Sequence, residues 1–433
     1  MKRWLKNYVD SISIEYSDSG TPLTMDRPVF WAPNWPIPEK GTTQLIINSW
    51  AALFLPDKKH GIKVIFPQGE TCSLNFSLKE LVNLIDTTLL SKPELIYLLL
   101  LSYDYGVRQL NLALNDFYQL PDWFLLLPAE GFLKMEGSTR VLNFNSSLPE
   151  LEIHDHQKFN KAPTGTIINE GKENYLQKIR QIRQLIAEGE FYQLNYTIRF
   201  SRKLWLNGLK LFRQWHSKTL APFSFYLQLP DFQLISVSPE RFWFQKGHLV
   251  QSEPIKGTIK TSTNPEHDAS LKNQLARSEK DHAELNMITD LLRNDLSRVC
   301  CPGSVKVMEQ SELRSFKYVH HLVSTIQGKL QPGKIFFDLI EATFPGGSIT
   351  GCPKIAAMQY INQLENHNRS FYTGSLFLRF PGNNLTDANI LIRTVILKDN
   401  WLHYQAGGGI VIDSNPETEY LECLAKAAPI LNG

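Results

Sequence analysis

The feature that most constrains this chain is a succession of short strand-like runs, broken by a few helical stretches without regular strand–helix alternation. Strand-like runs are predicted at 61–66, 191–200, 223–229, 234–237, 242–244, 320–326, 375–379, 390–397 and 401–405. Helices are predicted at 173–188, from about 276 to 297, at 354–365 and from about 416 to 431. Because parallel strands need crossover helices, this irregular order predicts an α+β fold built on antiparallel sheet.

Composition narrows the class of protein. The 433 residues, 42% of them hydrophobic, can fill a large core, which excludes a disordered chain. Its 45 Lys and Arg against 43 Asp and Glu lack the basic excess of a nucleic-acid binder. The longest apolar run, 95–101, is far shorter than the roughly 20 residues that span a bilayer. With no secretory pattern at the N-terminus and an odd set of five cysteines, we expect a cytoplasmic enzyme with free thiols and no membrane partner.

Carboxylates lie on an apolar helical face in the segment from 281. Glu284 shares a face with Ile288 and Leu291 by i, i+4, i+7 spacing, and Asp281 lies about one turn earlier. A buried carboxylate costs several kcal/mol unless it meets a cation or a proton. The alternative is a helix-end carboxylate that forms a salt bridge with Arg277 or Lys280.

A second acidic face is predicted in the C-terminal helix, where Glu419, Glu422 and Lys426 line up. Carboxylate oxygens from two helices would suit a Mg²⁺ ion that keeps several waters and meets a ligand. The alternative is an acidic first turn that complements the helix dipole, with Glu422 and Lys426 as a solvated i, i+4 pair.

Two glycine-rich segments offer backbone N–H groups to an anion. Gly407, Gly408 and Gly409 would let a ligand approach the backbone, and the alternative is a sharp bend or bulge between strands. The segment 344–354 spaces its glycines as in a P-loop. However, Cys352 stands where that motif requires Lys, so we reject this nucleotide-binding motif.

Glu240 and Lys256 sit at strand ends beside prolines, in the segments SPERF and PIKGT. A lysine between Ile and Gly can be desolvated, which lowers its pKa and frees a nucleophilic amine. A glutamate near it can act as a general acid. The alternative is that both are surface charges at turns. His321 is expected on the same face of a strand as Val319 and Val323. A lone histidine in such a position is more often a hydrogen-bonded core residue.

Taken together, these segments resemble the chorismate-utilising enzymes, which include anthranilate, aminodeoxychorismate, isochorismate and salicylate synthases. The matching segments are YQLN at 192–195, SPERF at 238–242, PIKGT at 254–258, DHAELNMITDLLRNDLSRVCCPGS from 281, YVHHLVSTI from 318, FPGGSITGCPK from 344, IRT at 392–394 and AGGGIVIDSNPETEYLECLAK at 406–426. The resemblance implies a large antiparallel β-sandwich flanked by helices, as in anthranilate synthase component I. It also implies that an N-terminal region, 1–160, packs with the catalytic region, 161–433, rather than standing alone.

Lys256 discriminates within this family. Anthranilate synthases usually carry Ala there, whereas PIKGT resembles aminodeoxychorismate synthases that form a covalent intermediate. The resemblance implies a large subunit that converts chorismate and ammonia to 4-amino-4-deoxychorismate for folate synthesis. It implies a separate glutaminase subunit as the ammonia source. The alternatives left open are anthranilate synthase, isochorismate or salicylate synthase, and a paralogue that binds chorismate without turnover.

The resemblance also implies roles for individual residues. Lys256 would be the nucleophile and Glu240 the general acid, with His321 and Thr350 near the ring and its leaving group. The positions that match the Mg²⁺ site are Glu284 and Glu422, with Glu419 and Asp281 as neighbours. The positions that match substrate contacts are Gly257, Thr258, Tyr372, Arg393, Gly407, Gly408, Gly409 and Lys426.

Overall fold

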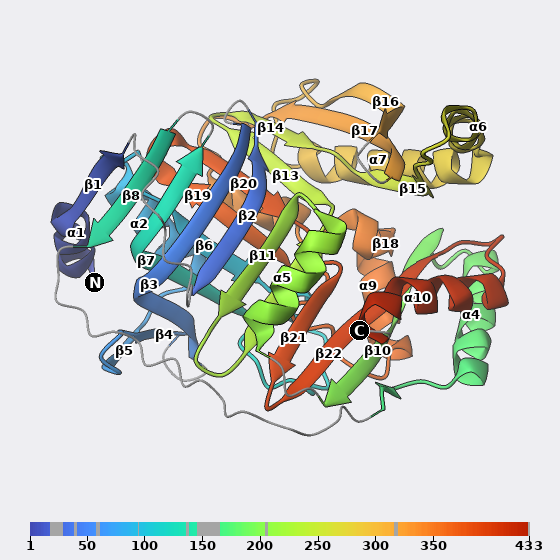
Figure 1. Ribbon diagram of the computed structural model, residues 1–433, viewed down its shortest axis with the longest axis horizontal. Coiled ribbons are helices and arrows are strands. Elements are labelled where there is room, and N and C mark those ends of the chain that lie inside the picture. Colours follow the sequence, from blue (N-terminus) through green and yellow to red (C-terminus); the bar gives the residue numbers. More distant parts are fainter. Residues whose placement is uncertain are drawn as a thin grey trace.

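The computed structural model describes residues 1–17, 29–38, 41–57, 61–93, 95–135, 138–144, 165–203, 207–315 and 319–431. Across these residues 22 strands join into one hydrogen-bonded ladder, and each strand pair is antiparallel. Two arms of the ladder leave the long strand β3 (Gly41–Asp57) and form the layers seen in Figure 1. The predicted α+β architecture with a large antiparallel sheet and flanking helices is confirmed.

The first arm ends in the strands that carry the glycine segment. From β3 it runs through β2 (Phe30–Ile37), β11 (Phe223–Gln228), β12 (Gln233–Ser238), β21 (Thr394–Lys398) and β22 (Trp401–Ile410) to β10 (Gln193–Lys203). The last strand also pairs with two short ones, β9 (Ile167–Ile168) and β18 (Gly351–Cys352).

The second arm ends in the strands that carry Lys256 and His321. It runs through β7 (Trp123–Met135), β6 (Tyr97–Leu101), β19 (Ser375–Phe380), β20 (Leu385–Asn389), β13 (Arg241–Lys246) and β14 (Leu249–Ser252) to β17 (Val319–Lys329), which pairs with β15 (Ile255–Lys260) and β16 (Lys306–Ser315). The remaining strands are β1 (Ile12–Ser17) and β8 (Ser138–Phe144), beside β7, and β4 (Gly61–Ile65) and β5 (Thr71–Leu74), beside β3.

Helices flank the sheets. They are α1 (Lys2–Ser11), α2 (Leu78–Leu89), α3 (Tyr103–Gln109), α4 (Lys172–Ala187), α5 (Gly208–Thr219), α6 (Pro265–Ala276), α7 (Glu279–Ser297), α8 (Phe336–Thr343), α9 (Lys354–Leu364) and α10 (Pro416–Leu431). The helix predicted at 173–188 is observed as α4, which buries Tyr175, Ile179 and Ile182 and packs beside α10. Among the described residues, no helix has the length and apolarity needed to cross a membrane.

N-terminal and C-terminal segments share the same sheets. β2 pairs with β11, and β6 pairs with β19, so strands on both sides of the predicted boundary at 160 hydrogen-bond to each other. The boundary itself lies outside the described residues, and the division remains a prediction. All five cysteines are free, as expected.

Three local predictions were wrong. The helix expected from about 276 begins at Glu279, and a separate helix, α6, precedes it because Asn264 and Pro265 start a helix of their own. The strand expected at 390–397 begins at Thr394, since Arg393 has a left-handed φ of 50°. The alternative of a bend at the glycine segment also fails, because β22 continues through it, paired with β10.

Candidate functional site

The predicted site residues gather where the last strands of the two arms approach α7 and α10. In Figure 1 both helices lie on the right-hand side of the molecule, with β15 close to α7. Lys256 Nζ of β15 lies 3.4 Å from Glu284 Oε2 of α7. Lys280 Nζ of α7 lies 3.9 Å from Glu419 Oε1 of α10. These two ion pairs join the second arm to α7, and α7 to α10.

A β-bulge presents Lys256. The register of β15 against β17 shifts between Lys256 and Thr258, around Gly257 with a φ of +62°. A Cβ on Gly257 would lie 2.7 Å from Leu275 Cδ1 and 3.0 Å from Asp281 Cγ. Glycine is therefore required here for its φ and for the close packing of α6 and α7.

Glu240 is a buried carboxyl between β12 and β13. Burial raises its pKa, while a hydrogen bond from Ser348 Oγ to Oε1 (2.7 Å) and the charges of Lys256 and Arg393 oppose that rise. The raised pKa favours a bound proton above the ordinary range of a glutamate, which suits a general acid. The electrostatic interactions also show that Glu240, Lys256 and Arg393 share one environment.

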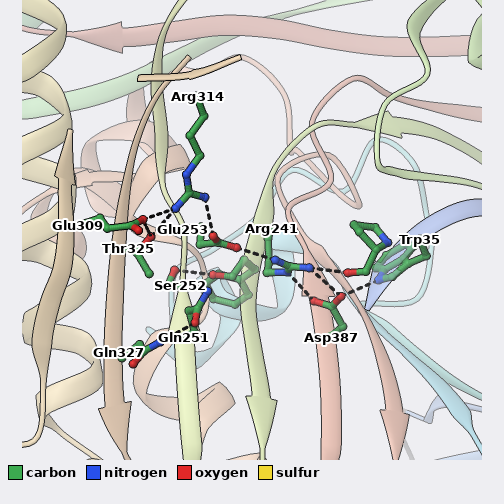
Figure 2. Close-up of polar contacts among 12 residues, drawn as sticks. Trp35, Arg241, Gln251, Ser252, Glu253, Glu309, Arg314, Thr325, Gln327 and Asp387 are labelled. Carbon is green, nitrogen blue, oxygen red and sulfur yellow. Dashed lines mark hydrogen bonds and ion pairs between the residues drawn. The ribbon is translucent and has the colours of Figure 1, made fainter. Parts of the chain in front are cut away.

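A second glutamate near the bulge has a structural role. Figure 2 shows Glu253 between Arg241 (2.6 Å) and Arg314 (2.8 Å), and Arg241 also binds Asp387. Although burial acts in the opposite direction, hydrogen bonds and charge from Arg314 and Arg241 lower the pKa of Glu253. The network ties the residue after Glu240 to the strand connection that leads to Lys256, so it fixes the two segments relative to each other.

His321 and Thr350 are both buried. His321 Nδ1 lies 2.9 Å from Thr258 Oγ1 and 3.2 Å from the Gly257 carbonyl oxygen, and burial lowers the pKa of the imidazole. The lowered pKa favours a neutral ring held against the bulge. Thr350 donates its hydroxyl to the Gly346 carbonyl (3.0 Å), so this hydroxyl stabilises its own loop.

The three glycines of β22 face two ways. A Cβ on Gly407 would lie 1.9 Å from the Tyr196 carbonyl oxygen, and one on Gly409 would lie 2.4 Å from Gln193 Nε2. A Cβ on Gly408 would instead point at α10, 3.3 Å from Glu419 Oε2. Backbone packing thus requires glycine at 407, a side chain at 409 would have to displace the end of the Gln193 side chain, and the space over Gly408 is bounded by polar atoms of α10.

The carboxylates of the two helices are balanced by lysines. Glu419 is buried and accepts a hydrogen bond from Ser414 Oγ (2.8 Å), while burial, with the charges of Glu422 and Glu284, raises its pKa. Lys280 Nζ lies 3.8 Å from Glu284 Oε1 and 3.9 Å from Glu419 Oε1. The alternative of basic neighbours that neutralise these carboxylates is therefore observed.

At the C-terminal helix the expected i, i+4 pair is formed: Lys426 Nζ lies 2.8 Å from Glu422 Oε1 and donates to the Gly407 carbonyl (2.8 Å). Asp281 accepts a hydrogen bond from Ser278 Oγ (2.5 Å) at the start of α7. Among the described residues, no group of three or more His, Cys, Asp or Glu forms a ready metal cage. Two carboxylates completed by substrate and water oxygens are a donor set that Mg²⁺ accepts in general, and the Mg²⁺ site stays a prediction.

Arg393 and Tyr372 differ in setting. Arg393 is exposed immediately before β21, and its positive charge acts on both Glu240 and His321. Tyr372 is buried, and its N–H donates to the Arg369 carbonyl (3.1 Å). The substrate contact expected for Tyr372 remains a prediction.

Some neighbours were not assigned from the sequence. Ser348 donates a hydrogen bond to the Glu240 carboxyl, and only its place in the FPGGSITG segment could have indicated this role from the sequence. Gln193 lies against Gly409, and neither its Nε2 nor its Oε1 has a hydrogen-bond partner among the described residues. The buried pair Arg369–Glu365 (2.7 Å) supports the Thr197 and Asn195 backbone through hydrogen bonds, and an i, i+4 spacing was its only signal.

Comparison with known proteins identifies the family. The model of the chorismate binding enzyme family matches residues 63–432. Aminodeoxychorismate synthase component 1 of Klebsiella aerogenes is 43% identical over 265 residues, 61% of this chain and 58% of that protein. The Escherichia coli protein of the same name is 42% identical over 264 residues, with the same coverage. Anthranilate synthase component 1 of Thermus thermophilus is 38% identical over 261 residues, 60% of this chain and 56% of that protein.

The matches to these curated relatives span less than three fifths of their length. A solved structure, anthranilate synthase component I from Streptococcus pneumoniae, superposes with a TM-score of 0.73 at 23% identity, covering 95% of this chain and 94% of that one. That likeness confirms the fold. From the family match over most of its length, the chain belongs to the chorismate-binding enzymes.

Proposed function

We propose that this protein is the chorismate-aminating component of an aminodeoxychorismate synthase, a transferase that acts in the cytoplasm. The observation that carries the proposal is Lys256 on a β-bulge, in the same environment as Glu240, whose pKa is raised by burial. Several relatives at 40–44% identity bear the name aminodeoxychorismate synthase component 1. The product would be 4-amino-4-deoxychorismate, a precursor of 4-aminobenzoate.

Two displacements would accomplish the amination. After the ammonium of Lys256 gives up a proton, its amine forms a C–N bond at C2 of chorismate. Both ring double bonds shift, from C1=C2 and C5=C6 to C1=C6 and C4=C5, and the C4–O bond breaks. Glu240 donates its proton to the departing hydroxyl, which leaves as water. Ammonia then bonds to C4, both ring double bonds shift back, and the lysine amine leaves C2. Covalent catalysis divides one poor substitution into two easier ones.

Carboxylates and cations would bind the substrate. Arg393 offers a planar guanidinium for a carboxylate, and Gly408 leaves the strand open beside Lys426. Glu284 and Glu422 would hold Mg²⁺, with Glu419 and Asp281 nearby. The ion would neutralise carboxylate charge and polarise the substrate. His321, kept neutral by burial, would hold the bulge through Thr258 and Gly257.

Ammonia would come from a separate glutaminase subunit, so the isolated chain should work with ammonium alone. The test supplies chorismate, Mg²⁺ and ¹⁵N-ammonium to the purified protein and identifies the product by mass. A labelled product that keeps its enolpyruvyl group supports the proposal. Anthranilate with released pyruvate would favour the second candidate function, anthranilate synthase, which the 38% identity to such an enzyme supports. An isomer of chorismate without added nitrogen would indicate an isochorismate synthase. Binding of chorismate without any product would indicate a non-catalytic paralogue.

The covalent step has its own test. Lys256→Ala should abolish product formation with ammonium, and intact-mass measurement of the wild-type protein should detect a substrate adduct that this variant lacks. Lys260→Ala, an exposed lysine on the same strand, is the matched control and should keep full rate. If Lys256→Ala turned over at the wild-type rate, the lysine-bound intermediate would be excluded.

A further inference from the structure

A cavity lies at the opposite end of the strand pair β10–β22 from the glycines. Its volume is about 450 Å³, and its lining includes Phe117, Arg199, Lys398, Trp401 and His403. At about 3.4 Å per strand residue, Trp401 is roughly 24 Å along β22 from Gly408. The cavity is thus separate from the site proposed for chorismate, and its volume is within the range of small-molecule pockets.

Aromatic rings form one part of the wall. The ring of Trp401 stacks nearly parallel to that of His403, with centroids 6.2 Å apart and an interplanar angle of 14°. Phe117 meets His403 edge-on, at 5.4 Å and 88°. Phe117 is also 48% exposed, so part of its ring is accessible from solvent. The wall therefore offers flat apolar surface to a planar ligand.

Cations form the other part. The guanidinium carbon of Arg199 lies 3.6 Å from the centroid of Phe117, and Nε and Nη1 of Arg199 are buried without a hydrogen-bond partner among the described residues. Lys398 Nζ donates to the Tyr118 carbonyl oxygen (2.8 Å). Burial, then the charges of Arg199 and Lys398, lower the pKa of His403 to about 4. Asp399 also lines the cavity and adds a negative charge. Tyr118 hydrogen-bonds to Arg199, while Nε and Nη1 of Arg199 still lack an acceptor among the described residues.

We propose that this cavity binds a small planar anion of the aromatic carboxylate class. The ring would pack on Trp401 and Phe117, and the carboxylate would accept hydrogen bonds from Arg199, with Lys398 adding charge. His403, neutral and hydrogen-bonded to Ser201 (2.9 Å), would serve as a wall rather than as a counter-ion. The inference is independent of the proposed function, because none of these residues belongs to the chorismate site.

The probe is 4-hydroxybenzoate, titrated calorimetrically into the full chain. Two analogues separate its features: 4-hydroxybenzamide keeps the ring but lacks the charge, and cyclohexanecarboxylate keeps the charge but lacks the aromatic ring. We expect saturable binding of 4-hydroxybenzoate and at least tenfold weaker binding of each analogue. The absence of saturable binding, or equal affinity for the acid and the amide, would overturn the proposal.

Variants locate the bound probe. Arg199→Gln and Trp401→Leu should each weaken binding at least tenfold, whereas Lys210→Gln, an exposed lysine of α5, should not change it. Arg393→Gln should also leave it unchanged. Loss of binding in Arg393→Gln, with Arg199→Gln and Trp401→Leu unaffected, would place the probe in the chorismate site and refute the inference. Using both cavity variants, each checked by circular dichroism, guards against a single misfolded variant.

Discussion

The two ends of the strand pair β10–β22 serve the molecule differently. At one end Gly407–Gly409 carry no side chains, and β22 faces the polar atoms of Glu419 and Lys426 on α10. At the other end Trp401 and His403 present stacked rings beside Arg199. The same ladder therefore provides an open backbone at one end and an aromatic, cationic wall at the other.

The difference lies in how each end is assembled. The glycine end takes its polar partners from α10, which follows β22 directly in the chain, so one continuous motif contains most of it. The ring end brings together 117, 199 and 398–403, which lie far apart in the sequence. A local motif can therefore indicate the first end, whereas only tertiary structure reveals the second.

The largest expected effect tests the proton transfer proposed for Glu240, which lies outside the strand pair β10–β22. Glu240→Gln cannot donate a proton, so turnover with ammonium should fall about 10²- to 10⁴-fold. Burial raises the pKa of Glu240, so wild-type activity should decline as pH rises through a value above the ordinary range of glutamate. Steady-state kinetics across pH should show this limb in the wild type and not in the variant.

The matched control for Glu240→Gln is Glu173→Gln, an exposed glutamate of α4, which should keep wild-type turnover. The raised pKa of Glu240 also determines how the free energy of unfolding changes with pH. A raised folded-state pKa contributes stability at low pH that is lost as pH rises, and the Gln variant should lack this loss. Full turnover in a Glu240→Gln variant would exclude Glu240 as the general acid.

The next effect separates two adjacent glycines. Gly407→Ala places a Cβ 1.9 Å from the Tyr196 carbonyl oxygen, so β10 and β22 must move apart, and the free energy of unfolding should drop by about 3 kcal/mol. Gly408→Ala meets only Glu419 Oε2 at 3.3 Å and Lys426 Nζ at 3.7 Å, at the ends of long side chains. We expect it to unfold in urea close to the wild type. Equal losses in both variants would contradict the two-faced arrangement of the glycines.

A smaller effect concerns how the stability of the end that carries Trp401 and His403 changes at acidic pH. The pKa of His403 is about 4 when folded, below its usual 6.5, so its contribution to stability is complete above about 6.5 and is lost as pH falls toward 4. At pH 4.5 this loss amounts to about 2 kcal/mol, and His403→Gln should escape it. Urea unfolding at pH 7 and pH 4.5 measures the difference.

His267→Gln, an exposed histidine of α6, is the control and should follow the wild-type pH dependence. His367 has a pKa lowered to about 4 for the same reason, burial, and remains in both proteins, so the His403→Gln variant should still lose stability in acid, but less steeply. An unchanged slope for His403→Gln would mean that the ring end does not hold its histidine neutral.

The sequence predicted those features that depend on local pattern. The apolar spacing of α4 and the carboxylate face of α10 appear where their periodicity places them. The glycine bend was not found, because pairing with Asn195–Thr197 keeps β22 extended through the glycines. Arg393 ended a predicted strand because of its left-handed backbone, which no side-chain pattern encodes.

The motifs indicated which residues form the candidate site, but they did not indicate which charged groups pair with one another inside it. Glu240 and Glu253 stand in similar sequence settings, each next to a proline, and only the tertiary contacts with Ser348, Arg241 and Arg314 separate an acid from a structural anion. Such pairings depend on which strands become neighbours across the sheet, and this is decided by packing over the whole chain.

The smallest expected effect concerns the pair Glu422–Lys426. Its side chains are 49% and 44% exposed, so a double-mutant cycle with Glu422→Gln and Lys426→Met should give a coupling energy below about 0.5 kcal/mol by urea unfolding. The exposed pair Asp290–Arg293 of α7 is the matched control and should give a similar value. If Glu422 binds Mg²⁺, adding the ion should weaken the first coupling and leave the second unchanged. A strong first coupling that ignores Mg²⁺ would instead make the pair a structural element of α10, and the carboxylates of the glycine end would then need another explanation.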